Sequence, residues 1–253
     1  DHASQQRAID ALRRFGERLR SFAPETVRAV TTDAMRVARN SHLVLPLAEA
    51  ALGFPIELIG GREEARLIFI GASNALPVAG HRRLVVDIGG GSTEFIIGEN
   101  TVPLMMESLF MGCISYRQRF FPEGRVDKKR MQAAEVAAAR EIETIAADYR
   151  RLGWHEAVGS SGSAQEIADI LDANGLNPAG MSGISREGLG KLRQLLIQAG
   201  SAEALGLQGM RNDRVAILPG VLAIMCAVFS ELEIEHMTYT DGALPLGVLY
   251  DLL

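Results

Sequence analysis

The chain has few of the residues on which several common kinds of site depend. Its only two cysteines, Cys113 and Cys226, lie far apart, with no metal-ligand spacing around them, and its five histidines form no pattern. Neither a disulfide framework nor a thiolate metal site is therefore indicated. We expect two reduced, partly buried thiols, as in a reducing compartment.

An excess of positive charge is also missing. The 26 Lys and Arg residues are outnumbered by 31 Asp and Glu residues, which gives a net charge of −5. This balance argues against a general surface for nucleic acid or anionic membranes. Nucleic acid is not an expected partner, and a polyanionic ligand would need a local basic patch or metal ions.

No apolar run is long enough to cross a bilayer. Hydropathy is highest over residues 215–229, which is shorter than the roughly 20 residues of a membrane-spanning helix and includes Pro219 and Gly220. We predict a core helix there. The protein is expected in the cytoplasm, with peripheral membrane association left open. Because the chain starts at Asp1 without a methionine, we expect a piece of a longer chain, and an upstream signal peptide stays open.

The most informative segment covers residues 84–98, Leu-Val-Val-Asp-Ile-Gly-Gly-Gly-Ser-Thr-Glu-Phe-Ile-Ile-Gly, which predicts two apolar strands joined by a glycine-rich turn. Asp87 lies near the end of the first strand, where a charge is costly unless it is paired or bound to a metal ion. The glycines would allow positive φ and a close approach to a ligand, so that successive N–H groups form a nest for phosphate. The candidate phosphate-binding residues of this turn are Gly89, Gly90, Gly91 and Ser92.

The residues after the glycines distinguish this turn from two commoner phosphate loops. Residues 94–98 alternate like a second strand and do not open a helix, and no lysine follows the glycines. Neither a P-loop nor a dinucleotide-binding turn has this pattern. An ordinary hairpin with Gly-Gly in its turn is the structural alternative. Asp87 before the turn and Glu94 after it favour a phosphate site.

The chain as a whole alternates helices and short strands, which is typical of an α/β fold. We expect helices over residues 3–22, 34–51, 113–121, 127–151, 164–171, 186–199 and 211–231, after Gly61 and at the C-terminus. We expect strands over residues 27–30, 56–59, 84–88, 94–98, 102–110, 157–163 and 236–240. Residues 67–70 are apolar on all sides, so their helix is expected to be buried between two lobes.

A second glycine-serine segment, residues 159–163, follows a predicted strand and opens a helix. Backbone N–H groups at a helix N-terminus favour phosphate, so a second phosphate could bind here. A plain helix N-cap explains the same residues equally well.

Several segments together resemble the exopolyphosphatase / guanosine pentaphosphate phosphohydrolase family, and bacterial exopolyphosphatases in particular. The resemblance covers essentially the whole chain and is carried by residues 32–40, 60–69, 86–98, 111–113, 159–163 and 240–243. It implies an α/β fold of the actin-like superfamily, with ribonuclease-H-like lobes whose mixed sheets are flanked by helices. Residues 1–83 would form the C-terminal part of domain I, and residues 84–253 would form domain II with the glycine-rich turn.

The resemblance implies a phosphohydrolase that releases terminal orthophosphate from inorganic polyphosphate by Mg²⁺-assisted attack of water. Guanosine pentaphosphate hydrolysis and a non-catalytic polyphosphate-binding fragment are the alternatives. Glu64 would be the general base, although Glu63 and Glu64 also suit the positive end of a helix dipole. Arg36 would clamp phosphate, and Asp87 and Glu94 would hold Mg²⁺. Further along the phosphate chain the candidates are Gly159, Ser160, Ser161 and Gly162.

Two departures from the family pattern are visible. Nothing corresponds to the Asp-Leu-Gly-Ser-Asn-Ser turn that forms the first phosphate loop of the family. After residues 241–244 the family often has Arg-Glu-Gly, where this chain has Pro245-Leu246-Gly247. Turnover by this chain alone is therefore left open, as is a homodimer of the complete protein. We expect the ligand between residues 1–83 and 84–253, with the glycine turn on one wall and Arg36 and Glu64 on the other.

Overall fold

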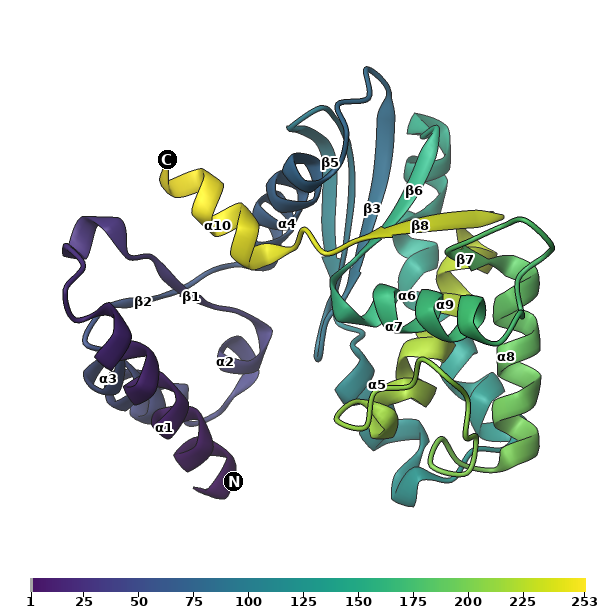
Figure 1. The fold of residues 1–253 in the computed structure, drawn as a ribbon, viewed down its shortest axis with the longest axis horizontal. Coiled ribbons are helices and arrows are strands. Elements are labelled where there is room, and N and C mark those ends of the chain that lie inside the picture. Colours follow the sequence, from purple (N-terminus) through teal and green to yellow (C-terminus); the bar gives the residue numbers. More distant parts are fainter. Residues whose placement is uncertain (1) are drawn as a thin grey trace.

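A computed structural model describes residues 2–253 as a smaller part beside a larger part that is built on a six-stranded sheet (Figure 1). In the smaller part, β1 and β2 pair in parallel, and α1 and α3 pack together at their side. The elements of the smaller part are α1 (His2–Leu19), β1 (Ala29–Thr31), α2 (Asp33–Val37), α3 (Ser41–Leu52) and β2 (Ile56–Leu58).

The six-stranded sheet has the order β5-β4-β3-β6-β8-β7. An antiparallel meander forms its first half, and β6 and β8 continue it in parallel with β3. The strands are β3 (Arg82–Ile88), β4 (Thr93–Glu99), β5 (Val102–Leu109), β6 (Glu156–Ser160), β7 (Ile184–Ser185) and β8 (His236–Thr240). This mixed sheet has the layout expected of a ribonuclease-H-like lobe, so the α/β prediction is confirmed.

Helices cover both faces of this sheet (Figure 1). They are α4 (Gly61–Ala75), α5 (Cys113–Phe120), α6 (Lys128–Leu152), α7 (Ser161–Ala173), α8 (Arg186–Ala199), α9 (Leu218–Glu231) and α10 (Leu244–Leu252). Successive residues of a strand point to opposite faces. Val86 and Phe95 accordingly pack into the large core with α5, α6, α7 and α9, whereas Val85 and Ile96 pack under α4.

Helix α4 packs against α10 with almost no space between the two backbones. A Cβ atom added to Gly247 would lie 1.8 Å from the carbonyl oxygen of Leu67, and one added to Gly71 would lie 2.2 Å from that of Ala243. Leu67, Ile68 and Phe69 are at most 2% exposed, as predicted for this helix, whereas Ile70 is only half-buried. Asp251 at the end of α10 accepts hydrogen bonds from Arg28 of the smaller part and from Arg66 of α4.

Several predicted boundaries are wrong. The expected helix 34–51 is two helices, because Ala38 has extended backbone angles that end α2. The expected strand 157–163 ends at Ser160, and α7 begins directly at Ser161. The segment expected to be helical from residue 211 becomes α-helical only at Leu218, and β7 was not expected. Apolar spacing alone does not reveal such breaks, because the pattern continues across them.

The helix crossing gives a testable prediction. We expect Gly247→Ala to lower the free energy of unfolding by about 1–3 kcal/mol, because the new methyl group meets the backbone of α4. The matched control is Gly190→Ala in α8, where a Cβ meets no atom within 4 Å. That control should raise stability by about 0.5–1 kcal/mol. Urea denaturation of both variants measures the difference, and equal effects would contradict the tight crossing.

Candidate functional site

A row of polar side chains crosses the sheet at one end. The strand register places Ser108 opposite Glu94, Glu94 opposite Asp87, Asp87 opposite Ser160, and Ser160 opposite Thr240. Directly paired residues lie on the same face of a sheet, so this row occupies the face that α4 covers. The next row on that face is largely apolar and belongs to the core, and it includes Ile96, Val85 and Val158.

Burial dominates the electrostatics of the two carboxyl groups in this polar row. Asp87 and Glu94 are 6% and 1% exposed. Loss of solvation raises the pKa of Asp87, and it raises the pKa of Glu94 to about 8, with a further contribution from the charge of Glu64. Hydrogen bonds oppose this effect: Ser108 Oγ donates to Glu94 at 2.7 Å, and Ser160 Oγ lies 3.2 Å from Asp87 Oδ2.

Arg36 and Glu64, two of the predicted site residues, are directly paired. Arg36 Nη1 donates to Glu64 Oε2 at 2.9 Å and to the carbonyl oxygen of Ile59 at 3.0 Å. Arg36 comes from the end of the short helix α2, and Glu64 comes from the first turn of α4. Glu63 instead pairs with Arg66 of the next turn. The arrangement therefore separates the two adjacent glutamates, with only Glu64 facing Arg36.

The glycine turn differs from the prediction in its backbone. None of Gly89, Gly90 and Gly91 has positive φ, so that expectation is wrong. A close contact explains Gly91 instead, and Gly90 is more loosely constrained. A Cβ on Gly91 would lie 1.8 Å from Asp33 Oδ2, and one on Gly90 would lie 3.1 Å from the side chain of Ile114.

The turn is closed by a hydrogen bond from the amide of Gly89 to the carbonyl oxygen of Ser92 at 2.9 Å. Among the hydrogen bonds of residues 2–253, none uses the amides of Gly90, Gly91 or Ser92 as donors. These three N–H groups therefore have no hydrogen-bond acceptor among the described residues.

The smaller part and the glycine turn approach each other closely. Asp33 lies against Gly91, as described above. A Cβ on Gly61 would lie 2.6 Å from Ser108 Oγ and 3.9 Å from Arg36 Nη2. The Arg36–Glu64 pair, the glycine turn and the Ser108–Glu94 pair are therefore neighbours.

Sequence analysis did not single out Asp33 as a candidate residue. Thr32 is the N-cap of α2, and its side chain makes no capping hydrogen bond. Asp33 is the first helical residue and is 8% exposed. The available signal was its position three residues before Arg36, which places both side chains on one helical face.

The second predicted phosphate segment is a direct junction between β6 and α7. Gly159 is buried within the strand, where a Cβ would lie 2.3 Å from that of Ala164, so packing explains this glycine. Ser160 is fully buried in the polar row. Ser161 has φ of 67°, an unusual value for a residue other than glycine and one that recurs at functional sites.

Arg214 is a second residue that sequence analysis missed. Its guanidinium would lie 3.6 Å from a Cβ on Gly162. It donates to Ser163 Oγ at 2.9 Å and to the fully buried carboxylate of Glu166 at 3.0 Å. Arg36 and Arg214 thus supply positive charge at the two candidate phosphate segments.

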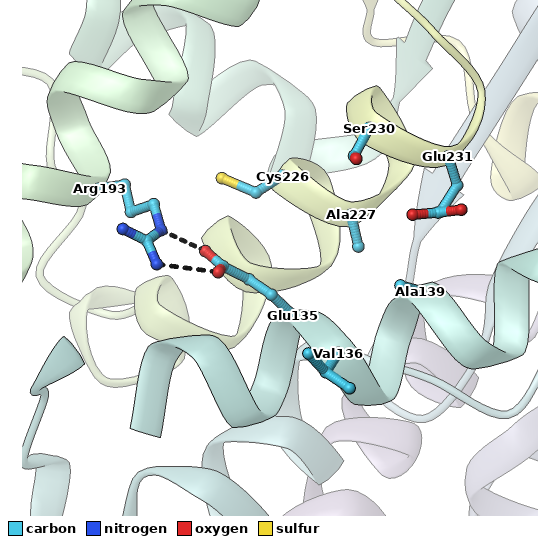
Figure 2. Close-up of a pocket in the computed structure, with 8 residues that line it drawn as sticks. All are labelled: Glu135, Val136, Ala139, Arg193, Cys226, Ala227, Ser230 and Glu231. Atoms are coloured by element: carbon cyan, nitrogen blue, oxygen red, sulfur yellow. Dashed lines mark hydrogen bonds and ion pairs between the residues drawn. The ribbon is translucent and has the colours of Figure 1, made fainter. Parts of the chain in front are cut away.

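A separate hollow of about 360 Å³ lies between α6, α8 and α9 (Figure 2). Arg193 there is already paired with both carboxylate oxygens of Glu135, at 2.5 and 2.9 Å. Burial raises the pKa of Cys226 to about 12, so its thiol is protonated at neutral pH. The hollow offers no free cation and no activated nucleophile, so we place the candidate site at the polar row. Its lining residues are Glu135, Val136, Ala139, Arg193, Cys226, Ala227, Ser230 and Glu231.

Two features are absent from the described residues 2–253. Within residues 2–253, no three His, Cys, Asp or Glu side chains converge on one metal position. Mg²⁺ nonetheless suits the Asp87–Glu94 pair, because it usually takes one or two carboxylates together with waters and substrate phosphates. None of the helices in that range is long and apolar enough to cross a bilayer.

Comparisons with known sequences point to one family. Residues 1–253 match the Ppx/GppA phosphatase family. A Haemophilus influenzae protein that carries the provisional name exopolyphosphatase is 40% identical over 246 residues, which cover 97% of this chain and 75% of that protein. A guanosine-5'-triphosphate,3'-diphosphate pyrophosphatase from Aeromonas hydrophila is 39% identical over 254 aligned positions, covering 99% of this chain. This chain spans half the length of the Aeromonas protein.

Solved structures share the fold. An exopolyphosphatase from Cytophaga hutchinsonii aligns with a TM-score of 0.85 and 24% identity, over 100% of this chain and 82% of that one. The Ppx/GppA family member from Aquifex aeolicus aligns with a TM-score of 0.76 and 19% identity, over 99% and 81% of the respective chains. At these identities the similarity establishes the arrangement of the elements.

The raised pKa of Glu94 predicts a pH-dependent stability. Without metal, folded Glu94 keeps its proton up to about pH 8, whereas an ordinary glutamate loses it near 4.5. The folded state then binds more protons between these values, so its stability falls as the pH rises through them. We expect Glu94→Gln to remove this loss and to raise Tm above that of the parent at pH 9 in a chelator. Each 1 kcal/mol regained corresponds to about 2–4 °C.

The difference in Tm between Glu94→Gln and the parent should shrink towards pH 5, where the parent carboxyl group is largely protonated. Glu99→Gln is the control, because Glu99 ends the same strand in an exposed position. Thermal melts at both pH values test this, and a constant difference between Glu94→Gln and the parent would contradict the raised pKa.

Proposed function

Because the chain belongs to the Ppx/GppA phosphatase family, we propose that it carries the phosphate-handling site of a phosphohydrolase that acts on inorganic polyphosphate or guanosine pentaphosphate. The names of the two curated relatives fit these two substrates equally well. The observation that carries the proposal is the meeting of the Arg36–Glu64 pair with the glycine turn and the polar row.

Glu64 is the proposed general base. Water must lose a proton as it attacks phosphorus, and a buried carboxylate in reach of the phosphate site suits that role. Arg36 Nη1 donates a hydrogen bond to Glu64 Oε2 at 2.9 Å. A bound phosphate group would compete for the guanidinium, so that Arg36 holds the phosphate while Glu64 becomes free to accept the proton.

Backbone donors would stabilise the negative charge on the reacting phosphate. The amides of Gly90, Gly91 and Ser92 are the proposed donors, because they have no protein acceptor among the described residues. Ser161, Gly162 and Arg214 would bind phosphates further along the chain, whereas Gly159 and Ser160 support this segment from within the sheet.

Asp87 and Glu94 are the proposed holders of Mg²⁺. Their burial leaves two carboxyl groups without a cationic partner in the polar row, which suits a divalent cation. When bound, Mg²⁺ would neutralise charge on the phosphate oxygens. The two carboxyl groups would lose their protons on binding, so we expect metal affinity to rise with pH.

The remaining proposals concern the complete protein. Residues 1–83 and 84–253 would belong to two domains with the ligand between them, and Glu64 and Asp87 would both reach one phosphate and its waters. A homodimer in the cytoplasm is the proposed state of the complete protein.

Glu64→Gln tests the role of the base. We expect this variant to lose about 10²- to 10⁴-fold in turnover while it keeps its affinity for polyphosphate, because the amide has the same shape but accepts no proton. Glu63→Gln is the matched control and should be mild, since Glu63 pairs with Arg66 and not with Arg36. Orthophosphate release and polyphosphate binding are measured for this chain and for the complete protein that contains it.

Assays of the parent on both substrates separate the candidate functions. A preference for one substrate in kcat/KM assigns the activity. Binding of polyphosphate without release of phosphate by either length of chain would support the non-catalytic alternative. A Glu64→Gln variant that keeps more than about half of the parent rate would remove Glu64 from its role.

Asp87→Asn tests the metal site. We expect the Mg²⁺ concentration for half-maximal activity to rise, because a neutral amide replaces an ionic ligand of a hard cation. Asp148→Asn, an exposed change on α6, is the control. An unchanged Mg²⁺ titration of Asp87→Asn would contradict the assignment.

A further inference from the structure

Two arginines carry side-chain hydrogen bonds from the smaller part of the fold to the rest of the chain. Arg36 donates to Glu64 in the first turn of α4, and this pair belongs to the candidate site. Arg28 donates to Asp251 near the end of α10, with Nη1 2.5 Å from Oδ2. The proposed function uses the first contact and gives the second no role.

Asp251 connects Arg28 to helix α4. Its Oδ1 accepts a hydrogen bond from Arg66 Nη1 at 2.8 Å, and its Oδ2 accepts one from Arg66 Nη2 at 2.9 Å. Arg66 in turn donates to both carboxylate oxygens of Glu63, at 2.8 and 2.9 Å. A chain of ion pairs therefore runs from the smaller part to the first turn of α4, and we call it the clasp. Its members are Arg28, Asp251, Arg66 and Glu63.

The clasp ends beside the proposed base. Glu63 is followed directly by Glu64, whose amide donates to the carbonyl oxygen of Gly60 at 2.9 Å as α4 begins. Glu63 pairs within the clasp, whereas Glu64 pairs with Arg36. The first turn of α4 is thus attached to the smaller part at two places, through Arg36 directly and through the clasp.

The central charges of the clasp are partly shielded from water. The side chains of Arg28 and Asp251 are 17% and 23% exposed. Hydrogen bonds from Arg66 and Arg28 hold the pKa of the Asp251 carboxyl group below its usual range, so this group is ionised at neutral pH. Partly exposed ion pairs add little to stability. We therefore expect the clasp to govern where the two parts lie more than whether the chain folds.

We propose that the clasp positions Arg36 and Glu64 for the reaction, with Asp251 as its central positioning residue because it accepts from both arginines. This inference rests on the proposed function, in which Arg36 leaves Glu64 to hold the phosphate. The smaller part then loses one of its two attachments to α4, and the clasp remains. It keeps Arg36 within reach of a phosphate beside Glu64, and a misplacement of about 1 Å in such groups is costly for a reaction.

Hydrogen exchange, followed by mass spectrometry on the full chain, tests the clasp without turnover. We expect Asp251→Asn to speed exchange at the amides of residues 64–67 about two- to fivefold, because an ion pair that holds this turn is lost. Arg28→Gln breaks the same contact from the other side and should have a similar effect. Asp251→Glu keeps the charge and should restore slow exchange.

Glu57→Gln is the matched control. Glu57 pairs with Arg28 within the smaller part and is 53% exposed, so its loss leaves the clasp connected. Exchange in this variant should equal that of the parent. The amides of α6 in the large core are the internal reference. Unchanged exchange at residues 64–67 in both Asp251→Asn and Arg28→Gln, or an equal increase in α6, would overturn the proposal.

Steady-state kinetics distinguish positioning from a purely structural contact. In the complete protein that contains this chain, we expect Asp251→Asn to lower kcat for orthophosphate release about tenfold, with a smaller change in KM. Asp251→Glu should recover most of the rate, and Glu57→Gln should match the parent. A kcat of Asp251→Asn within about twofold of the parent value would overturn the positioning role.

Glu64→Gln separates the two levels of the argument. Loss of turnover in Glu64→Gln together with an unchanged rate in Asp251→Asn would overturn the role of the clasp and leave the proposed function standing. A Glu64→Gln variant with the parent rate would overturn the proposed base and the positioning role with it. Faster exchange at residues 64–67 and a lower kcat in Asp251→Asn, both reversed in Asp251→Glu, would support the proposal.

Discussion

Asp87 and Glu94 face one another across neighbouring strands where water is nearly excluded, and the candidate site depends on this burial. Two carboxyl groups in such a place destabilise the fold when they ionise without a cation. Their position follows from strand alternation, because the same register that buries Val85 and Ile96 under α4 carries these acids to the end of that face. The hydroxyls of Ser108 and Ser160 then provide hydrogen-bond partners.

The sequence predicted the parts of the site that lie within one short segment. The strand-turn-strand at residues 84–98 was visible from two apolar runs around three glycines, and the motifs of the family located Arg36 and Glu64. The contacts that explain the glycines were not predictable in the same way. Gly91 is required by the close approach of Asp33, which is far away in sequence, and not by positive φ.

Long-range pairing explains the other omissions. Ser108 and Thr240 join the polar row through the register of strands that are distant in sequence, and no local pattern fixes that register. Arg214 precedes α9 but reaches the junction at Gly162, so only the folded chain connects them. The break that separates α2 from α3 was also hidden, yet it leaves Asp33 and Arg36 on a short helix of their own.

The charge of the site also limits the form in which a substrate can enter. Arg36 and Arg214 are each partly neutralised by a buried glutamate, so neither presents its full charge to a polyanion. The acids around the glycine turn would repel free phosphate chains, and the net charge of −5 adds to this effect at long range. A phosphate chain that carries divalent cations would meet the opposite situation, because a cation can neutralise Asp87 and Glu94, whose hydrogen-bond partners are uncharged hydroxyls. Under the proposed function, this arrangement would favour a metal-complexed polyanion over the free one.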